Sequence, residues 1–437
     1  MTPAELAQFI ERRRRFAETV GDGLAVIPGA QELGRNGDVA YEFRQSSDFY
    51  FLTGFDEPDA LAVINPSHAK ERYVLFVRPR DRELEIWNGR RAGVEGAIAD
   101  YGADAAYPID QLDAKLREYA LDRSTLVYRL GNPAYDTRIT RLVTELRPAR
   151  ARGSAPPGRL EDPGPALHEL RLRRSAAELA WQRRACQISR EAHAEAMRVA
   201  RPGLFEYQVQ AALEYVFRVE GSPRNAYPSI VASGPNACIL HYQENRRRIG
   251  EGELILIDAG CEHGYHASDI TRTFPAGGRF SAPQCAIYEL VLRAQLAALA
   301  AARPGQPFEA VHDAARRTLT KGLVALGLLP RSVEDSLAMH LYREFFMHGT
   351  GHWLGMDVHD VGAYHLDSAA RPLEPGFYLT VEPGIYISAD AAGVPPEYRG
   401  IGVRIEDDVL VTASGRDVIT SDVPKDPEAV ERAVKGS

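Results

Sequence analysis

The sequence predicts an α/β N-terminal domain followed by an α+β C-terminal domain. Its 437 residues exceed the size at which a single hydrophobic core usually stops growing. Short apolar runs alternate with amphipathic segments up to about residue 150, whereas strand-like segments dominate from Ile230 onward. Between them, residues 149–165 are rich in Pro, Gly and Arg, as linkers are. We therefore expect a first domain with its linker over 1–165 and a second domain over 166–437.

The first domain contains four short apolar runs with the length and composition of buried strands. They are Leu24–Ile27, Leu61–Ile64, Tyr73–Val77 and Leu126–Tyr128. An amphipathic segment at Leu112–Tyr119 lies before the last run and predicts a helix. Strands and helices in alternation indicate an α/β fold.

Four consecutive arginines, Arg12–Arg15, lie in the first predicted helix. No apolar stretch follows them, as it would in a secretory signal. We interpret the four arginines as the solvated face of that helix. The net charge of −8 gives no indication of a nucleic-acid partner.

Two further features of the composition bear on the cellular setting. No run of 18 or more apolar residues occurs, so we expect no association with a membrane. The cysteines show no CxxC pairing, which favours a reducing cytoplasm; they are Cys186, Cys238, Cys261 and Cys285.

The second domain is expected to open with helices. Ser175 followed by Glu178 has the spacing of a capping box, and the helix that it starts ends near Gly203. A second helix is expected at about 205–219. Two more are expected at about 283–302 and 308–326.

Two aspartates occupy predicted strands of this domain. Asp258 ends the apolar run of residues 254–257, where a carboxylate is costly to bury unless it is paired or binds metal. Asp269 begins another alternating strand eleven residues on. A hairpin would place them side by side, and a divalent cation between them would remove their repulsion. The alternative is a capping aspartate and a separate surface aspartate.

Two glutamates repeat this pattern. Glu382 lies in an apolar strand that Pro-Gly ends, and Glu406 lies in a strand otherwise fit for a core. Arg404 shares a face with Glu406, so a purely structural ion pair between them is the alternative. Four carboxylates in four apolar strands together favour a metal site.

Three histidines occur within twelve residues of a glycine-rich segment: His348, His352 and His359. Glycine disfavours a helix here and permits close approach of the backbone to a ligand. His352 and His359 are seven residues apart, so the chain must bend to bring both to one site, and Gly355 is the expected hinge. His241 follows a short apolar run, and both a packed histidine and a site residue stay open for it.

The segments LIDAG, SDITRTFP, HGTGHWLGMDVHDVG, TVEPGIY and RGIGVRIEDD, in this order, resemble the creatinase/aminopeptidase family, whose catalytic domain has the pita-bread fold. Within that family, the chain is most similar to the Xaa-Pro aminopeptidase (aminopeptidase P) branch. The segment RNGDVAYEFRQSSDFYFLTGFDEPDA also looks like the first domain of that branch. The resemblance covers essentially the whole chain. It implies an α+β pita-bread catalytic domain that releases the N-terminal residue from peptides with proline in the second position.

The resemblance also implies a dinuclear metal site. The five implied ligands are Asp258, Asp269, His352, Glu382 and Glu406. Asp269 and Glu406 would bridge both ions, Asp258 would serve one, and His352 and Glu382 the other. Four carboxylates balance two divalent cations, and mostly oxygen donors favour Mn²⁺, although Zn²⁺ and Co²⁺ also bind such sites.

The remaining implied residues act on the peptide. They are His241, His348 and His359 as substrate-binding and catalytic residues, and Arg404 as the active-site arginine. In this hypothesis, a hydroxide activated by two metal ions attacks the first peptide carbonyl. Glu382 takes the proton and delivers it to the leaving nitrogen. His359 and His241 donate hydrogen bonds, and His348 lines the pocket for proline.

Other interpretations stay open at this point. A prolidase would use the same ligands on Xaa-Pro dipeptides, and a non-catalytic pita-bread binding protein would bind peptides without cutting them. The family resemblance also implies a homodimer or homotetramer. Trp87 is either a first-domain residue that closes a neighbouring subunit's site or a buried aromatic.

Overall fold

The chain forms two compact units in the computed structural model, which describes residues 1–436. The first unit ends at Arg171 and the second begins at Leu172. The boundary predicted between residues 165 and 166 lies within the helix α7, Gly164–Leu172. None of the helices in the described part of the chain combines the length and hydrophobicity needed to span a bilayer.

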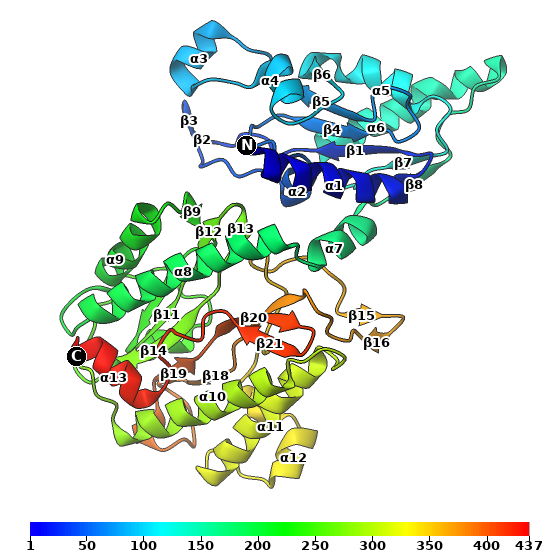
Figure 1. Ribbon diagram of the computed structural model, residues 1–437. Helices are drawn as coiled ribbons and strands as arrows, with labels where there is room; N and C mark the ends of the chain where they lie inside the picture. The colour runs from blue at the N-terminus through cyan, green and yellow to red at the C-terminus, as the bar shows by residue number, and fades with distance from the viewer. Residues whose placement is uncertain (437) are drawn as a thin grey trace. The chain divides into compact units, whose positions relative to one another are not determined.

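The first unit is built on a six-stranded mixed sheet with the order β6-β5-β4-β1-β7-β8 (Figure 1). Its strands are β1 (Leu24–Pro28), β4 (Leu61–Ile64), β5 (Tyr73–Val77), β6 (Ala105–Pro108), β7 (Thr125–Val127) and β8 (Arg159–Glu161). A separate hairpin consists of β2 (Gly34–Asn36) and β3 (Val39–Ala40). The four apolar runs predicted as strands are confirmed as β1, β4, β5 and β7. The edge strand β8 lies in the segment predicted as a linker.

Helices cover both faces of this sheet (Figure 1). The helices of this part of the chain are α1 (Pro3–Val20), α2 (Ser47–Thr53), α3 (Arg82–Asn88), α4 (Gly93–Ala99), α5 (Leu112–Ala120) and α6 (Pro133–Leu146), followed by α7. Of these, α3 has no buried residue and does not cover the sheet. Side chains of α5 and α6, such as Leu116 and Ile139, form one core with Val26 and Phe76 of the sheet. Because strand residues alternate between faces, this core uses every second residue of β1, β4 and β5.

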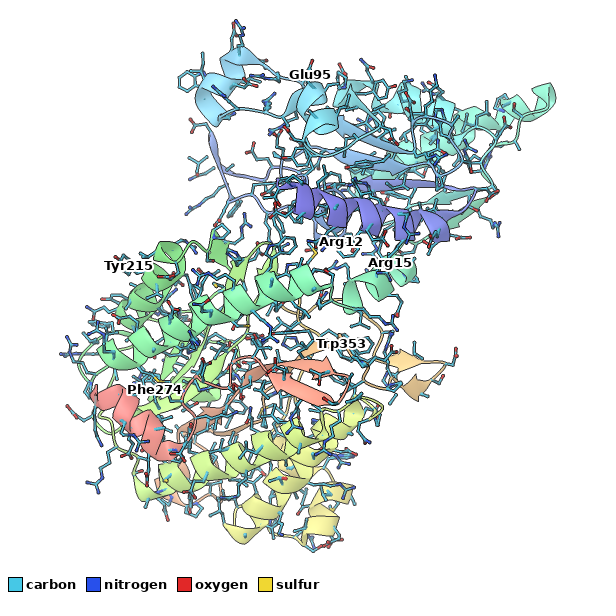
Figure 2. The ribbon with its side chains drawn as sticks, viewed as in Figure 1. Arg12, Arg15, Glu95, Tyr215, Phe274 and Trp353 are labelled. Carbon is cyan, nitrogen blue, oxygen red and sulfur yellow. The ribbon has the colours of Figure 1, made fainter. Side chains whose placement is uncertain are left out.

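The arginine run of α1 corrects one expectation. Arg14 and Arg15 are exposed, but Arg12 and Arg13 are buried, so the prediction that all four form a solvated face is wrong (Figure 2). Arg13 donates a hydrogen bond to the carbonyl of Leu52 (2.9 Å) and lies over the ring of Tyr73, 3.9 Å from its centroid. The guanidinium is planar and weakly hydrated, which lets it stack on an aromatic ring inside a protein.

The helix α3 presents its apolar side chains to solvent. Trp87 is 83% exposed and Ile86 is 81% exposed, and α3 has no buried residue. The alternative that Trp87 is a buried aromatic is therefore wrong.

The second unit contains strands of a curved α+β domain. They are β9 (Arg224–Asn225), β10 (Ile230–Ser233), β11 (Leu254–Asp258), β12 (Cys261–His263), β13 (His266–Ala267), β14 (Thr271–Pro275), β15 (His365–Leu366), β16 (Ala369–Ala370), β17 (Tyr378–Val381), β18 (Gly384–Ile387), β19 (Ile401–Arg404), β20 (Asp407–Thr412) and β21 (Gly415–Val418). The order is β10-β11-β14 in one antiparallel sheet, β17-β20-β21 in another, and β18-β19 in a pair. The backbone N–H of Glu406 donates to the carbonyl of Thr271 (3.1 Å), which joins β14 to the segment between β19 and β20.

The helices of the second unit pack around these strands (Figure 1). They are α8 (Ala176–Val199), α9 (Glu206–Val219), α10 (Ala282–Ala301), α11 (Glu309–Ala325), α12 (Val333–Ala338) and α13 (Pro427–Lys435). Short 3₁₀ helices occur in both units, at Ile109–Gln111, Arg147–Arg152, Gly234–Cys238, Leu341–Glu344 and Pro396–Tyr398. The predicted capping box is confirmed: the Ser175 side chain accepts from the Glu178 N–H, and Glu178 accepts from the Ser175 N–H. The cores on the two sides of the strands include Phe274 and Trp353 (Figure 2).

Candidate active site

Two strand ends bring the predicted aspartates together. Asp258 is the last residue of β11, and Asp269 lies two residues before β14, which pairs with β11 in register Asp258↔Thr271. The hydroxyl oxygen of Tyr227 lies 2.7 Å from Oδ1 of Asp258 and 2.5 Å from Oδ1 of Asp269, so its one hydrogen is shared between the two carboxylates. The short hairpin β12–β13 is inserted between the two strands. The structure thus places the carboxylates side by side.

The two glutamates come from the next sheet connections. Glu382 directly follows β17, and Glu406 lies between β19 and β20. The hydroxyl of Thr271 donates to Oε2 of Glu406 (2.6 Å), and that of Thr380 donates to Oε1 of Glu382 (3.2 Å). Each carboxylate therefore has one oxygen oriented by a threonine.

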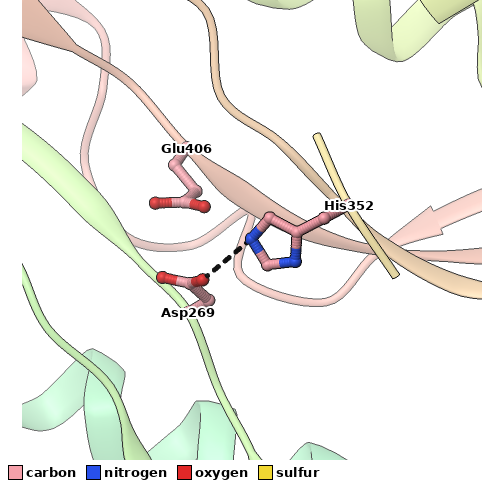
Figure 3. Close-up of side chains that lie close together, drawn as sticks. All are labelled: Asp269, His352 and Glu406. Atoms are coloured by element: carbon pink, nitrogen blue, oxygen red, sulfur yellow. Dashed lines mark ion pairs between the residues drawn. The ribbon is translucent and has the colours of Figure 1, made fainter. Parts of the chain in front are cut away.

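The ring of His352 has a fixed orientation. Its Nδ1 lies 3.0 Å from the carbonyl of Trp353, and because a carbonyl only accepts, Nδ1 carries the hydrogen. Its Nε2 faces Oδ2 of Asp269 (3.4 Å) and Oε1 of Glu382 (3.5 Å). Ligand atoms of Asp269, His352 and Glu406 lie within 4.8 Å of one another, and Figure 3 shows these side chains facing one another. The contact of Nδ1 with the carbonyl of Trp353 is typical of a metal-ligating histidine, whose second ring nitrogen donates to a backbone carbonyl.

The chain bends after His352, as predicted. The rings of His352 and His359 are 4.3 Å apart between centroids. The bend begins at Gly355, the expected hinge, and continues through His359. A Cβ at Gly355 would overlap the guanidinium of Arg174 and the carboxylate of Asp360, which form a buried ion pair. Glycine is needed at this position for space.

Arg404 belongs to a different ion pair from the one considered. Its Nη2 lies 2.5 Å from Oδ2 of Asp258, and its Nη1 donates to the hydroxyl of Tyr386 (2.9 Å). The same hydroxyl lies 2.8 Å from Nε2 of His348. Arg404 thus pairs with Asp258 in place of the ion pair with Glu406 that the sequence left open, and Tyr386 connects it to His348.

All nine predicted site residues line one cavity of about 580 Å³. They are Asp258, Asp269, His352, Glu382, Glu406, His241, His348, His359 and Arg404. His241 and His359 are exposed and His348 is half-buried, so the alternative of a packed core histidine at position 241 is wrong. Tyr227 and Tyr364 also line the cavity and were not predicted.

Burial and mutual repulsion perturb the carboxylates. Burial raises the pKa of Glu382 to about 7, with a further contribution from Asp269 that His352 opposes. Burial, then Asp269 and Glu382, hold the pKa of Glu406 well above its usual range. Burial alone would lower the pKa of His352, but the contact with Asp269 and the charge of Glu382 raise it to about 9.

Divalent cations fit this arrangement. Four carboxylates share the cavity with Arg404 and His352, and burial also raises the pKa of Asp258. Such repulsion is relieved when a cation lies between the oxygens. Oxygen donors with one imidazole form a donor set suited to Mn²⁺ or Zn²⁺.

Comparison with known proteins decides the family. Residues 180–413 match metallopeptidase family M24, and residues 9–128 match the aminopeptidase P N-terminal domain. The chain belongs to metallopeptidase family M24. The predicted resemblance and the two predicted domain types are thereby confirmed, and this M24 protein is a hydrolase.

Relatives of this M24 chain match it over nearly their whole length. The Xaa-Pro aminopeptidase of Escherichia coli (strain K12) is 42% identical over 434 residues, 99% of this chain and 98% of the relative. That of Haemophilus influenzae is 44% identical over 425 residues, 97% of this chain and 96% of the relative. Among solved structures, Pseudomonas aeruginosa aminopeptidase PepP has a TM-score of 0.97 at 48% identity, covering 99% of this chain and 98% of that one. Zn-substituted E. coli aminopeptidase P in complex with product has a TM-score of 0.95 at 41% identity, with the same coverage.

Proposed function

We propose that this M24 chain is an Xaa-Pro aminopeptidase, which releases the N-terminal residue from peptides with proline in the second position. The observation that carries the proposal is the convergence of all nine predicted ligand and substrate residues on one cavity. Relatives named Xaa-Pro aminopeptidase are 42% and 44% identical over nearly the whole chain. Solved neighbours include an E. coli aminopeptidase P with the inhibitor Pro-Leu.

The proposed cofactor is a pair of divalent ions, with Mn²⁺ preferred. Their ligands would be Asp258, Asp269, His352, Glu382 and Glu406, with Asp269 and Glu406 shared between the ions. When bound, such ions polarise the scissile carbonyl and lower the pKa of a bound water. The position of His352 Nε2, which faces Asp269 and Glu382, and the repulsion among the carboxylates support this assignment.

Glu382 is the proposed proton carrier. Its carboxylate lines the cavity beside the other proposed ligands, where it can take up and release the proton of a bound water. The hydroxyl of Thr380 orients one of its oxygens. Glu382 would hold the proton from water and pass it to the leaving nitrogen. A proline nitrogen has no N–H for an enzyme to recognise, so the reaction depends on the carbonyl side of the bond.

The histidines are proposed to bind the peptide. Burial lowers the pKa of His348 to about 3, so its ring is neutral. Its Nδ1 lies 2.6 Å from the carbonyl of Gly349, to which it donates, and its Nε2 accepts from Tyr386. A ring whose nitrogens are both occupied suits the wall of a proline pocket. His241 and His359 are exposed and remain available to donate hydrogen bonds to the substrate.

A peptide panel separates this proposal from its rivals. Purified protein is incubated with Xaa-Pro-Yaa tripeptides, Xaa-Pro dipeptides and Xaa-Ala-Yaa controls in the presence of Mn²⁺. An aminopeptidase of this type releases Xaa from Xaa-Pro-Yaa and acts poorly on the control. Cleavage restricted to dipeptides would indicate a prolidase, and binding without cleavage would indicate a non-catalytic binding protein.

A homodimer or homotetramer is proposed as the assembly. The exposure of Trp87 (83%) and Ile86 (81%) on α3 supports it, because large apolar side chains are usually covered. Trp87 would then help to close a neighbouring subunit's site. Sedimentation of the wild type and of Trp87→Ser, each with its activity measured, tests both statements. We further propose a reducing cytoplasm as the compartment, supported by four cysteines that are all free.

A further inference from the structure

The segment between the two site histidines 348 and 352 has a single side chain. It reads Gly349, Thr350, Gly351, and an added Cβ at Gly351 would overlap the carbonyl of Thr380. Gly349 and Gly351 line the cavity, whereas Thr350 does not line it and is only 2% exposed. Thr350 therefore anchors this glycine-rich segment from outside the cavity.

The hydroxyl of Thr350 reaches a histidine that takes no part in the proposed chemistry. Its Oγ1 lies 2.9 Å from Nδ1 of His312. His312 lies on α11, between the buried residues Val311 and Ala315, so a packed helix fixes its position. A side chain on such a helix is a more rigid support than one on a loop.

Aromatic packing joins the same helix to the cavity. The ring of His312 packs against Phe346, with centroids 5.6 Å apart, and Phe346 packs against His348 at 5.0 Å. Phe346 is 1% exposed. His312 thus contacts both Phe346, three residues before Gly349, and Thr350 within the glycine-rich segment.

Backbone hydrogen bonds connect Thr350 and its segment to the proposed metal ligands. Its carbonyl accepts from the N–H of Glu382 (2.8 Å), and the carbonyl of His352 accepts from the N–H of Thr380 (2.9 Å). The segment therefore runs alongside the end of β17, and the position of Thr350 sets its register there. The same register is held further along by the N–H of His352, which donates to the hydroxyl of Thr380 (3.1 Å), and by the pairing of Trp353 with Leu379.

We propose that His312 is a positioning residue, which holds His352 and Glu382 in ligand geometry through Thr350. The inference rests on the proposed function, because it assigns those two residues to one metal ion. His312 touches neither substrate nor metal in this account. Supporting residues of this kind typically change metal affinity or activity by roughly 10- to 100-fold when they are lost.

The test compares four single variants of the full chain. Thr350→Val and His312→Phe remove the hydrogen bond, and His312→Phe keeps a ring against Phe346. Thr350→Ser restores the hydroxyl. Thr318→Val is the matched control, because Thr318 lies on α11 like His312 and its hydroxyl donates to the carbonyl of Ala314 within that helix (2.9 Å). Mn²⁺ affinity is measured by competition with a chromogenic chelator, and kcat and KM are measured on an Xaa-Pro-Yaa tripeptide.

Thr350→Val and His312→Phe are expected to bind Mn²⁺ roughly tenfold more weakly and to lose kcat more than KM. Thr350→Ser and Thr318→Val should match the wild type. A double variant that combines Thr350→Val with His312→Phe should lose no more than either single variant, because both substitutions remove the same bond. Unchanged Mn²⁺ affinity in His312→Phe, or additive losses in the double variant, would overturn the proposal. If the wild type itself cleaves no Xaa-Pro peptide, the proposed function fails while the Mn²⁺ affinities still test the role of His312.

Discussion

Arg404 and Asp258 form a buried ion pair in the wall of the cavity, with Nη2 and Oδ2 2.5 Å apart. The same guanidinium donates through Nε to the hydroxyl of Thr271 (3.1 Å) and through Nη1 to that of Tyr386 (2.9 Å). One planar group thus ties a proposed metal ligand to two neighbouring strands. A lysine cannot donate in these three fixed directions.

Arg404→Lys should therefore keep the positive charge but lose most of the hydrogen bonds that the guanidinium makes. Hydrogen bonds to charged groups contribute about 1.5–3 kcal/mol, so kcat/KM should fall roughly 10- to 100-fold. Arg399→Lys is a control, because Arg399 is exposed and bonds to the carbonyl of Val394. Steady-state kinetics on a tripeptide gives the comparison. Activity in Arg404→Lys equal to that of the control would show that the charge alone suffices.

Glu382→Gln tests the proposed proton carrier. The amide keeps the shape of the side chain and removes its ability to carry a proton, so kcat should fall by roughly 10²–10⁴. Glu374→Gln, a partly exposed glutamate that pairs with Arg173, should retain wild-type turnover. Stopped assays with concentrated enzyme give the residual rate. Full turnover in Glu382→Gln would remove Glu382 from the mechanism.

The buried side chain of His193 is expected to lower the free energy of unfolding in mild acid. Burial lowers the pKa of His193 to about 4 from the ordinary 6.5, while its Nε2 hydrogen-bonds to the carbonyl of Ala259 (3.0 Å). The unfolded chain takes up this proton first as the pH falls. The stabilisation is therefore complete above pH 6.5 and is lost progressively toward pH 4, by about 3 kcal/mol for this group.

Unfolding midpoints of the metal-free protein between pH 7.5 and 4.5 give the measurement. His193→Gln keeps an amide donor for Ala259 and should show a flatter dependence on pH. The same pH dependence in the wild type and in His193→Gln would assign the acid sensitivity to other groups.

Arg13 and Arg14 are predicted to differ in their effect on stability. Arg13→Ala removes the bond to Leu52 and the stacking on Tyr73, so the free energy of unfolding should fall by about 2 kcal/mol. Arg14→Ala changes an exposed side chain and should stay within about 0.5 kcal/mol of the wild type. Denaturant unfolding of the two variants gives the comparison. Equal effects would show that the buried contacts of Arg13 add nothing.

The sequence was most informative where a residue contradicts its surroundings. Asp258 at the end of an apolar strand and three histidines among glycines indicate a site, because burying such groups is costly without a partner. Tyr386 was not predicted because a tyrosine in an apolar strand is typical of a core, and Tyr227 because no motif marks its neighbours Asn225 and Pro228. Their hydroxyls matter only through contacts made by the fold.

Other features depend on contacts between residues that are far apart in the sequence, and these could not be predicted from local patterns. The space required at Gly355 depends on Arg174, which is 181 positions earlier in the sequence. The burial of Arg13 depends on Tyr73 in a different element. Edge strand β8 carries polar residues and exposes all three, so no apolar pattern indicates it. Residues 149–165 do have the composition of a linker, but the prediction that all of them lack regular structure is wrong for Arg159–Glu161, which form β8.

The dependence of peptide hydrolysis on bound metal tests whether this chain is an aminopeptidase that uses two metal ions. Protein stripped with a chelator is titrated with Mn²⁺ while release of Xaa from an Xaa-Pro-Yaa tripeptide is followed and bound metal is counted. We expect no release without metal and full activity at two ions per chain. Undiminished release by the stripped protein, or no release at two bound ions, would contradict it.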